Sequence, residues 1–538
     1  MDYRGYFYVG ERIMDFCEEC GSRISVDCRF CENCGTAIDM VNDKMNTDVV
    51  TAIDLFKSFN WQTTWLEAAE LCNCSDHDLG IIITDERKLL DMIPVDKNSF
   101  NELILSYINN AKTRRVDYYY LDLSNNCINN LDSETALADI IRTLKQLVNV
   151  ARPKYCFILG NENIVDFMVW ENKSPDDDVN VFSDLPYASL NCNSPWEGQR
   201  YDFTEIMRVG RLTTYEGETF AQFERYFYNV MNTAEKVSSI IPYCLSAYEW
   251  KEESQHEFST ISESLIDTSP ETTDNIVQQK FENNTNLFFF NLHGSDKTKF
   301  WYGQKNNKYP EALSPSALKN HSAAYFLGVE ACYGANYANN ISAENSILQM
   351  ALQTKCLAFL GSSKIAYGTS EPEGSCADIV VGEFIRHISK GESAGDAYVY
   401  GLEKLFSDDD ISDAEIKTFA EFALYGDPSV RAFPDIKNKC KFNKKTVKKS
   451  LFVPMPDVLN ATRLSLTQIN EKLEKQIDAF VSKIIPESIL MNSTQKVYHM
   501  ENKRYYQKVY ISKKDDITNI AKVYFNGNGN VLKLLFSK

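Results

Sequence analysis

A chain of 538 residues with a formal net charge of -19 is long enough for several domains, and its acidic balance argues against broad nucleic-acid binding, which requires a basic surface. Its 44% of hydrophobic residues is typical of a globular protein with a large core. Because no apolar run approaches the roughly 18 residues of a membrane span and no signal-type segment stands at the start, we expect a cytoplasmic protein without membrane partners.

The first motif along the chain is a pair of Cys-x-x-Cys sequences, formed by Cys17, Cys20, Cys31 and Cys34. Each pair can give two thiolates to one tetrahedral zinc ion, and four thiolates leave no open coordination position. A redox role would need a thioredoxin-like strand and helix around the motif, which the sequence does not contain. We therefore expect a zinc ribbon over residues 12–38 with one structural Zn²⁺ per chain, and no cofactor for catalysis.

The zinc ribbon is expected to dock onto a partner. Acidic residues outnumber basic ones around its cysteines, which favours a regulatory protein over nucleic acid as that partner. The chain has 15 cysteines in all, an odd and scattered set that is unlike a disulfide framework. This usage agrees with a reducing compartment.

A helical connector over residues 39–78 is expected to lead into alternating strands and helices. The predicted strands are 80–85, 116–123 and 155–159, and the predicted helices are 99–112, 133–148 and 219–236. Such alternation predicts an α/β fold with a mostly parallel sheet flanked by helices. The acidic run Asp176–Asp178 lies in a polar segment, which is typical of a solvated loop.

Two apolar runs further along the chain each end in a reactive side chain. Leu287–Leu292 leads to His293, and Tyr325–Val329 leads to Cys332. Central strands of a parallel sheet have this composition, and their carboxyl ends form sites, so imidazole and thiol would face one crevice. The imidazole could activate the thiol as a nucleophile. Gly294 would leave room for a substrate backbone, and its N–H could hold an oxyanion together with that of Cys332. The alternative is a buried structural cysteine near an unrelated histidine.

The residues around this pair resemble the caspase-fold (clan CD) cysteine peptidases, and the gingipain family in particular. Four motifs in the family's order carry the resemblance over about residues 79–433. One is the His/Cys pair, formed by the stretches His293–Ser295 and Glu330–Ala335, and the other three are Ser183–Ala188, Arg208–Leu212 and Leu424–Ser429. The resemblance implies a peptidase domain over residues 79–436 that acts as a cysteine endopeptidase. It assigns Cys332 as nucleophile, His293 as general acid/base, and the N–H groups of Gly294 and Cys332 as the oxyanion hole, with no metal in the chemistry.

The resemblance also indicates where a specificity pocket would form. In arginine-specific gingipains, the stretch after the strand that corresponds to residues 240–247 supplies an acid at the pocket floor, and the loop corresponding to 362–375 forms a wall. The candidates are therefore Glu252, Glu253, Glu257, Tyr367, Glu371 and Glu373. A carboxylate in a desolvated pocket would favour substrates with Lys or Arg before the scissile bond, and Arg more than Lys because its guanidinium can form two parallel hydrogen bonds to the carboxylate. The alternative is a solvated acidic loop.

Past Phe433 the resemblance ends, because gingipains carry an immunoglobulin-like domain at this position. Residues 437–450 are expected to form a basic linker. Residues 451–538 predict an α+β accessory domain with a helix over 464–484, three or four strands and a hairpin turn at Asn526–Gly529. We expect this domain to regulate the enzyme or to dock a protein partner. An enzyme that prefers basic residues could also cleave itself in the exposed linker.

Two other functions remain open from the sequence. The chain could be a catalytically silent caspase-fold scaffold that acts through protein–protein interaction, although such a scaffold needs neither His293 nor Cys332. It could instead be a nucleic-acid-binding zinc ribbon with a regulatory domain, which its acidic charge disfavours. The sequence leaves the physiological substrate and the activation trigger undetermined.

Overall fold

The computed structural model describes residues 15–16, 23–24, 77–126, 140–141, 144, 153–189, 194–197, 203, 206–233, 239–336, 342–407, 411–432, 464–485, 490, 493–500, 505–514 and 516–538. The chain forms two compact units, Met1–Ser58 and Phe59–Lys538. Within the described ranges, every helix is too short or too polar to cross a membrane.

The first unit contributes two short strands, β1 (Asp15–Phe16) and β2 (Arg23–Ile24), which pair antiparallel. In sequence they stand on either side of the first Cys-x-x-Cys motif. The expected zinc ligands Cys17, Cys20, Cys31 and Cys34 lie outside the described residues, as do the basic linker over 437–450 and nearly all of the connector over 39–78.

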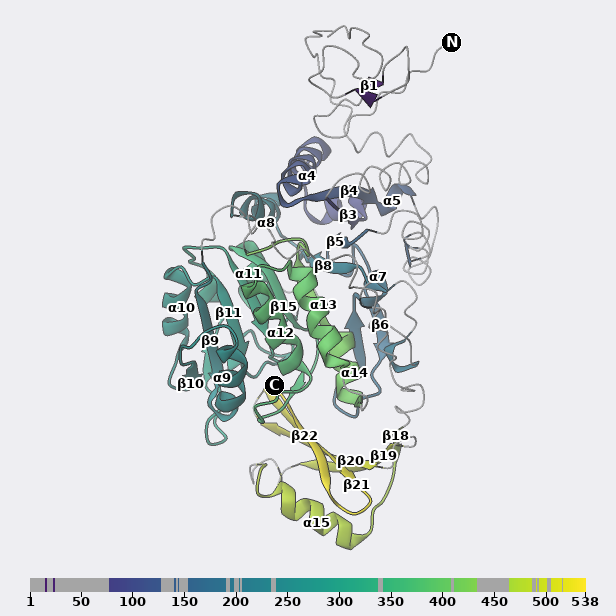
Figure 1. Ribbon diagram of the computed structural model, residues 1–538, viewed down its shortest axis with the longest axis vertical. Coiled ribbons are helices and arrows are strands. Elements are labelled where there is room, and N and C mark those ends of the chain that lie inside the picture. Colours follow the sequence, from purple (N-terminus) through teal and green to yellow (C-terminus); the bar gives the residue numbers. More distant parts are fainter. Residues whose placement is uncertain are drawn as a thin grey trace. The chain divides into compact units, whose positions relative to one another are not determined.

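A ten-stranded sheet forms the centre of the second unit, in the order β10-β9-β11-β14-β15-β17-β8-β5-β3-β4 (Figure 1). Its strands are β3 (Asp78–Thr84), β4 (Val116–Asp122), β5 (Tyr155–Leu159), β8 (Arg208–Leu212), β9 (Pro242–Ala247), β10 (Asp267–Ser269), β11 (Leu287–Asn291), β14 (Tyr325–Val329), β15 (Cys356–Ser362) and β17 (Phe422–Gly426). Neighbours run parallel except β15 and β17, which are antiparallel. The sheet therefore consists of two parallel halves of opposite direction, and the expected mostly parallel α/β sheet is confirmed.

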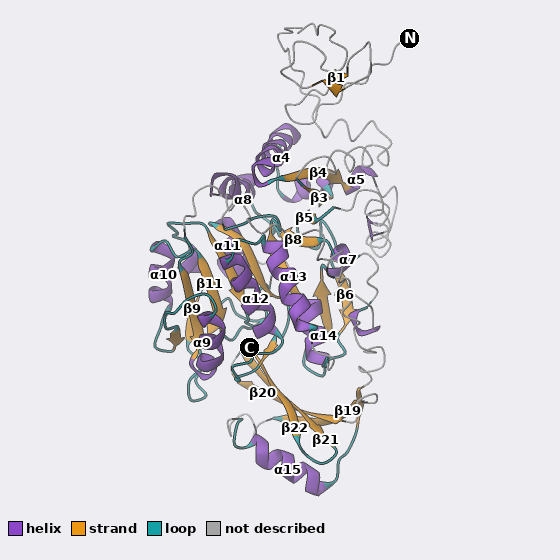
Figure 2. Ribbon diagram, in the orientation of Figure 1, coloured by secondary structure: helices purple, strands orange, loops and turns teal. Residues whose placement is uncertain are grey.

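Two groups of helices pack against this sheet. Helices α12 (Ala377–Ser389) and α13 (Ala394–Leu405) pack together over the face turned to the viewer in Figure 2. A second group, α4 (Lys97–Ala111), α8 (Phe220–Thr233) and α11 (Ile347–Gln353), contacts β4 and β15. Every residue of β11 and β14 is buried, as expected for strands that helices cover.

Shorter elements complete this part of the chain, which we call the central-sheet domain (residues 77–432). They are α3 (Glu86–Met92), α5 (Leu123–Asn126), α7 (Leu185–Ala188), α9 (Lys251–Ser259), α10 (Asp274–Glu282), α14 (Asp413–Glu421), β6 (Met168–Glu171), β7 (Asn180–Ser183), β12 (Trp301–Tyr302), β13 (Glu311–Leu313) and β16 (Tyr367–Gly368). The two-residue strand β16 lies in the segment that the sequence predicted to be a loop.

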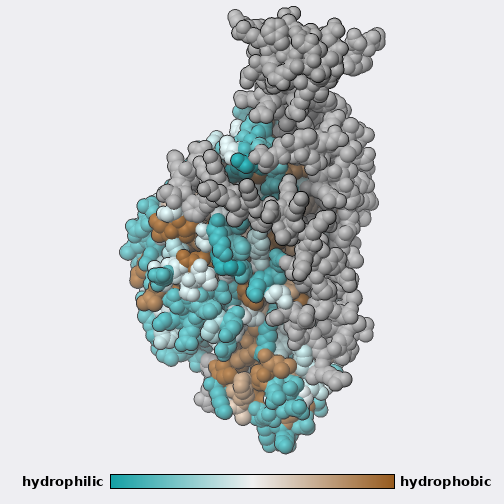
Figure 3. All heavy atoms as spheres, in the orientation of Figure 1, coloured by the Kyte–Doolittle hydropathy of each residue, from teal (hydrophilic) through white to brown (hydrophobic). Residues whose placement is uncertain are grey.

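Residues 464–538 build a second sheet and one helix, which together we call the C-terminal module. Its strands β18 (Leu464–Leu466), β19 (Thr494–Met500), β20 (Tyr505–Lys514), β21 (Ile517–Asn526) and β22 (Val531–Ser537) build an antiparallel sheet that takes in β16 of the central-sheet domain as a sixth strand, in the order β16-β22-β21-β20-β19-β18. Figure 3 shows hydrophobic surface over this sheet. The three or four strands expected from the sequence correspond to β19–β22, and β22 pairs with β16 of the central-sheet domain.

The predicted helix of this module begins later than expected. Leu464–Leu466 is a strand paired with β19, and α15 (Glu471–Val481) begins after Asn470. The side chain of Asn470 accepts a hydrogen bond from the backbone N–H of Leu473, which is the usual way to start a helix. The expectation of a helix from residue 464 is therefore wrong, because cross-strand pairing holds the preceding residues extended.

The acidic run Asp176–Asp178 is not the solvated loop that the sequence predicted. Lys417 of α14 reaches the buried carboxylates of Asp176 and Asp178, with N–O distances of 2.7 and 2.6 Å. A run of like charges predicts solvation only when no opposite charge is buried with it. Here the opposite charge comes from a helix more than two hundred residues away in sequence, which a local reading cannot detect.

Three of the motifs that carry the family resemblance have a structural role in the sheet. Arg211 of β8 forms a two-pronged ion pair with Asp184, with N–O distances of 2.9 and 2.5 Å, and donates to the carbonyls of Gly160 and Val165. Asp427, just after β17, accepts hydrogen bonds from groups that lie far away in sequence; they are Arg114, Tyr107 and Tyr118. Both acids are buried and fully paired, so these motifs stabilise the half of the sheet that contains β8 and β17.

Candidate active site

His293 and Cys332 follow neighbouring strands at the same level of the sheet. Phe290 of β11 pairs with Val329 of β14 in a parallel register, and each reactive residue comes three positions later. A glycine follows His293 for a steric reason, since a Cβ on Gly294 would lie 1.7 Å from the carbonyl oxygen of Cys332. The space left by Gly294 is thus occupied by the backbone of Cys332, whereas the sequence suggested a substrate backbone there.

The side chain of His293 is buried and oriented by a glutamine. Its Nε2 lies 2.7 Å from Oε1 of Gln304, and its ring packs near those of Trp250 and Tyr309, with centroid distances of 4.3 and 5.1 Å. Because a carbonyl oxygen accepts, Nε2 carries the proton and Nδ1 has a free lone pair. Burial and the nearby Lys538 charge lower the pKa of His293 to about 4, so the ring is neutral at neutral pH.

Cys332 is buried within a mainly apolar cluster. Ile365 and Tyr367 of the central-sheet domain belong to this cluster, together with Ile520 and Leu535 of the C-terminal module. The Sγ atom contacts the carbonyl of Ala366 at 3.5 Å. Burial raises the pKa of the Cys332 thiol well above its usual value. In this structure the thiol is therefore protonated and the imidazole beside it in the sheet is uncharged.

The last residue of the sequence, Lys538, reaches this site. Strand β22 pairs antiparallel with β16, with Ser537 opposite Tyr367, and the N–H of Lys538 donates to the carbonyl of Ala366 at 3.0 Å. The N–H of Cys332 donates to the carbonyl oxygen of Lys538, also at 3.0 Å. An extended segment thus runs along β16, and the backbone N–H of the candidate nucleophile binds the carbonyl oxygen of Lys538.

The side chain of Lys538 enters a pocket lined by three carboxyl groups. Its Nζ lies 2.8 Å from Asp378, 3.5 Å from Glu330 and 3.9 Å from Glu253, and all four side chains are fully buried. The same Nζ stands 4.4 Å from the centroid of the Trp250 ring, within reach of a cation–π contact. These groups come from four places in the fold: the start of α12, the residue after β14, α9, and the 3₁₀ turn Tyr248–Trp250.

The pocket contains more acidic groups than the single ammonium can neutralise. Asp378 accepts hydrogen bonds from the backbone N–H groups of Thr369 and Ser375 at 2.8 and 2.9 Å, which hold its side chain in place. Neither oxygen of Glu330 has a hydrogen-bond partner among the described residues. Burial raises the pKa of Glu330 well above its usual range, and the neighbouring Glu253 and Asp378 add to this effect. The pocket therefore contains one acid held by backbone N–H groups, Asp378, and two further buried acids, Glu330 and Glu253, that share the same ammonium.

The same three acids could hold a metal ion. Each of Glu253, Glu330 and Asp378 offers a carboxylate oxygen within 4.8 Å of the others, and oxygen ligands at this spacing suit a divalent cation. The ammonium of Lys538 lies within ion-pair distance of all three. A lysine side chain and a cation would therefore compete for one position.

The sequence of this part of the chain matches the family model for peptidase family C25 over residues 80–433. The chain belongs to peptidase family C25. Its members are cysteine endopeptidases, so this chain is an enzyme that acts on protein or peptide substrates. A search of curated proteins found no match.

Two solved structures are similar to this C25 chain. A complex of the pro- and mature domains of RgpB from Porphyromonas gingivalis is 10% identical, with a TM-score of 0.47, and the alignment covers 84% of this chain and 99% of that one. A second structure, described as a protease, is 12% identical, with a TM-score of 0.44, and the alignment covers 86% of this chain and 91% of that one.

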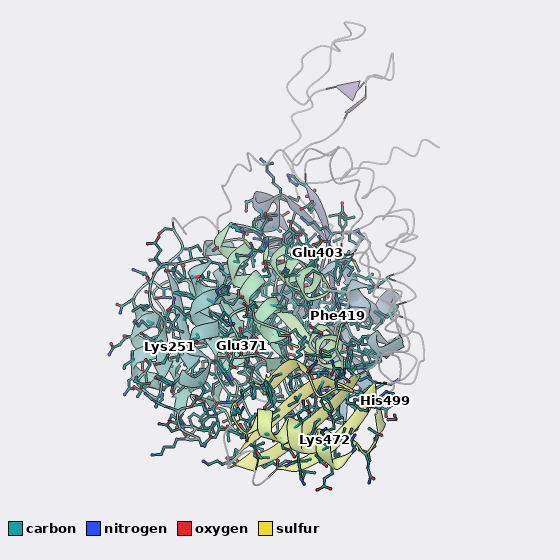
Figure 4. The ribbon with its side chains drawn as sticks, turned by 60° about the horizontal axis from the view of Figure 1, so that its bottom comes forward. Lys251, Glu371, Glu403, Phe419, Lys472 and His499 are labelled. Atoms are coloured by element: carbon teal, nitrogen blue, oxygen red, sulfur yellow. The ribbon has the colours of Figure 1, made fainter. Side chains whose placement is uncertain are left out.

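The residues expected in the specificity pocket of this C25 peptidase have different locations. Glu253 lies in the pocket, as described above, so the alternative of a solvated acidic loop is wrong for this residue. Glu257, one turn further along α9, is partly buried near Asp378, and burial with that neighbour raises its pKa to about 7. Tyr367 contributes its backbone to β16, and its hydroxyl group donates to Asp176 at 2.8 Å. Three of the expected residues are exposed to solvent instead; they are Glu252, Glu371 and Glu373 (Figure 4 labels Glu371).

Sequence reasoning missed several residues that the structure brings together here. Asp378 reads as an ordinary acid in the first turn of a helix, and Lys538 reads as the end of a separate domain. Trp250 and Gln304 stand in segments without any motif. Only Glu330 carried a signal, since it lies two residues before Cys332 within the family motif. No local pattern could have paired a lysine with acids that lie 160 or more residues away.

A cavity opens beside the residues that follow His293 and Cys332 in sequence. Its volume is about 460 Å³. Ser295 and Asp296 line it from the histidine side, and Tyr333 and Gly334 line it from the cysteine side. A peptide that extended beyond the position of the Lys538 carbonyl, which the N–H of Cys332 binds, would have space in this cavity.

Proposed function

We propose that the chain is a cysteine endopeptidase that uses Cys332 and His293 and cleaves after basic residues, lysine above all. The observation that carries the proposal is the position of Lys538. Its carbonyl accepts from the N–H of Cys332 while its ammonium is surrounded by Asp378, Glu330 and Glu253. A substrate lysine bound in the same way would have its carbonyl next to the nucleophile.

The chemistry then follows from the atoms already in place. Nδ1 of His293, the ring nitrogen with a free lone pair, takes the proton of the Cys332 thiol. The thiolate attacks the substrate carbonyl, a C–S bond forms, and the N–H of Cys332 stabilises the oxyanion; by family resemblance Gly294 supplies a second N–H. The C–N bond breaks as the imidazolium protonates the leaving amine, and water then hydrolyses the thioester. Gln304 is a positioning residue, because it holds the tautomer that leaves Nδ1 unprotonated.

The pocket supports lysine as the preferred residue before the cleaved bond. A compact ammonium fits between three carboxyl groups without needing a planar, two-pronged partner. A Cβ on Gly368 would lie 2.0 Å from Cε of Lys538 and 2.3 Å from Asp378. The pocket wall at Gly368 therefore packs tightly against the lysine side chain. Arginine, the residue favoured by bidentate pairing alone, has a wider head group and should be accepted less well.

Hydrolysis of peptide libraries by matched variants tests the proposal. Because Lys538 fills the space that a substrate lysine needs, the assay uses the Lys538→Ala chain as well as the unaltered chain. Cys332→Ala or His293→Ala, each added to Lys538→Ala, should lower hydrolysis by about a thousandfold or more, and the two losses should not add, since the residues act as one unit. Hydrolysis that persists in the Cys332→Ala variant, or cuts mainly after acidic or apolar residues, would refute the assignment.

Self-processing is part of this proposal. The dense basic stretch Lys437–Lys449 offers the residues that the pocket would accept. Incubation of the Lys538→Ala chain beside its Cys332→Ala counterpart, followed by sequencing of new termini, should reveal cuts in the linker only when Cys332 is present. A linker that stays intact in active enzyme argues against self-processing alone.

We further propose a cytoplasmic enzyme whose zinc ribbon docks a regulatory protein. The four-cysteine donor set suits one structural Zn²⁺, and the pairing of β1 with β2 on either side of the first cysteine pair is compatible with a zinc knuckle. Metal analysis of the purified chain should find one zinc ion, and Cys17→Ser should lower that content. An unchanged zinc content in this variant would show that the ligands are other residues.

A further inference from the structure

We propose that the C-terminal module is a built-in inhibitor of the peptidase and that Lys538 is its inhibitory residue. This inference rests on the proposed function, since it assigns Lys538 to the site at which a substrate lysine would bind. The sequence indicated only that the module regulates the enzyme or docks a protein partner. The inference now specifies what the module binds, namely the proposed active site of its own chain.

The first support is that β22 binds as a substrate would. An extended peptide that adds to a sheet edge gains backbone hydrogen bonds, while pockets select its side chains. Here Phe536 and Ser537 pair with Gly368 and Tyr367, and Lys538 exchanges backbone hydrogen bonds with Ala366 and Cys332. The segment thus has the backbone pairing, the carbonyl position and the side-chain pocket of a bound peptide.

The second support is that the module is anchored to the central-sheet domain by buried charge. Lys522 of β21 lies 3.1 Å from Asp413 at the start of α14, and both are fully buried. Tyr524 and Gln507 donate to the same carboxylate at 2.8 and 3.1 Å. Lys533 of β22 pairs with Glu415 at 2.6 Å. Four residues of the module thus bind two acids of α14, which fixes β22 in its register over the site.

The third support is the state of the catalytic pair under the module. Ile520 and Leu535 of the module share the apolar cluster that buries Cys332, and Lys538 contributes to lowering the pKa of His293. A thiol is a nucleophile only as the thiolate. The module therefore blocks the substrate pocket and also keeps the nucleophile in its unreactive form.

Tethering makes this inhibition strong without high intrinsic affinity. A segment linked to its own binding site acts at an effective concentration in the millimolar range when the linker can span the distance. An added substrate must compete with that local concentration. Activation then requires an event that lifts β22 from β16.

The test compares Lys538→Ala with Lys472→Ala in the full-length chain. Lys472 is an exposed lysine of α15 in the same module (Figure 4), away from the pocket. Two readouts are used: kcat/KM on a peptide with one internal lysine, and the rate at which iodoacetamide alkylates Cys332, followed by peptide mass spectrometry. Lys538→Gln serves as a second variant, and thermal unfolding verifies that each variant is folded.

If the open form of the unaltered chain is populated at a few per cent, Lys538→Ala should raise kcat/KM and Cys332 alkylation by at least about tenfold. Lys472→Ala should change neither. Equal alkylation rates in the unaltered chain, Lys538→Ala and Lys538→Gln, all folded, would overturn the inference. Faster alkylation without any hydrolysis would leave the inhibitor in place and refute the proposed peptidase activity, so the two failures are distinguishable.

A peptide added in trans gives a second arm. The hexapeptide Lys533–Lys538 should inhibit the Lys538→Ala chain competitively against a lysine substrate, whereas the same peptide with alanine at its last position should inhibit at least about tenfold less well, because a buried charge pair is lost. Equal inhibition by both peptides would show that the lysine side chain contributes nothing to binding in the pocket.

Discussion

Two buried acidic clusters in the two halves of the central sheet differ in how their charge is balanced. Around Asp427, each carboxylate oxygen has its own donors: Arg114 and Tyr107 bind one oxygen, and Tyr118 and the N–H of Ser429 bind the other. Around Lys538, one ammonium faces three carboxyl groups, and Glu330 has no hydrogen-bond partner among the described residues. The Asp427 donors all belong to the central-sheet domain, whereas the cation in the pocket comes from the C-terminal module.

This difference separates a structural cluster from a binding site. Burying a charge costs free energy unless it is paired, so a cluster that only stabilises the fold is expected to be fully paired. Surplus acids kept at a strand end beside a nucleophile store unfavourable free energy that an incoming cation relieves. We therefore interpret the Asp427 cluster as scaffold and the Lys538 pocket as a recognition site, and four predictions test that contrast.

The largest effect is expected from Asp378→Asn. In the Lys538→Ala chain this change removes the carboxylate that backbone N–H groups hold in the pocket. Losing one partner of a buried charge pair costs about 3–5 kcal/mol, so kcat/KM for lysine substrates should fall roughly a hundredfold to several thousandfold. Peptide hydrolysis measures it. Asp91→Asn, at an exposed position of α3, is the control and should have no effect. A loss below threefold would mean that Asp378 does not recognise the substrate.

Asp427→Asn should affect stability and leave specificity intact. The change leaves the Arg114 guanidinium buried without its counter-ion, which should lower the free energy of unfolding by about 3 kcal/mol. Urea unfolding followed by tryptophan fluorescence measures the loss. The ratio of lysine to arginine cleavage should stay at its original value; a changed ratio would contradict the division between scaffold and pocket.

Gly368→Ala tests how tightly the pocket wall fits the side chain of a bound lysine. The new Cβ would collide with the position of Cε of Lys538 and with Asp378, and overpacking of this kind costs about 1–3 kcal/mol. Lysine substrates should then lose roughly tenfold in kcat/KM in the Lys538→Ala chain, since 1.4 kcal/mol is about a factor of ten. Gly527, in an open turn where a Cβ would meet nothing, provides the matched Gly→Ala control.

The smallest effect concerns the protonation of His293. Its pKa in the closed chain, about 4, lies below the usual 6.5, so the neutral ring stabilises the closed form above about pH 6.5 and that contribution is lost as the pH falls through about 4. Lys538→Ala removes a nearby positive charge and admits water, and the pKa should move up toward 6.5. NMR titration of the imidazole resonances, assigned with His293→Gln, measures the shift. An unchanged value would show that the module does not control the protonation of His293.

Much of the fold followed from patterns along the chain. Apolar runs of five or six residues predicted β5, β11 and β14 almost to the residue, because strands covered by helices must be apolar throughout. The same runs placed His293 and Cys332 at the ends of neighbouring strands, and Glu253 was among the pocket candidates. Local periodicity and strand-end chemistry are properties of short segments, so the sequence by itself determined them.

Only the tertiary structure decided which charges meet. It paired Lys417 with the acids Asp176 and Asp178 and brought Lys538 to Asp378 and Glu330. In the structure Gly294 packs closely against the backbone of Cys332, whereas the sequence suggested that it leaves room for a substrate. The side chains of Glu252, Glu371 and Glu373 lie at the surface. An ion pair depends on the distance between atoms and on local burial, and neither quantity is encoded by neighbours in sequence. The acidic pocket and the lysine that fills it are therefore properties of the folded chain.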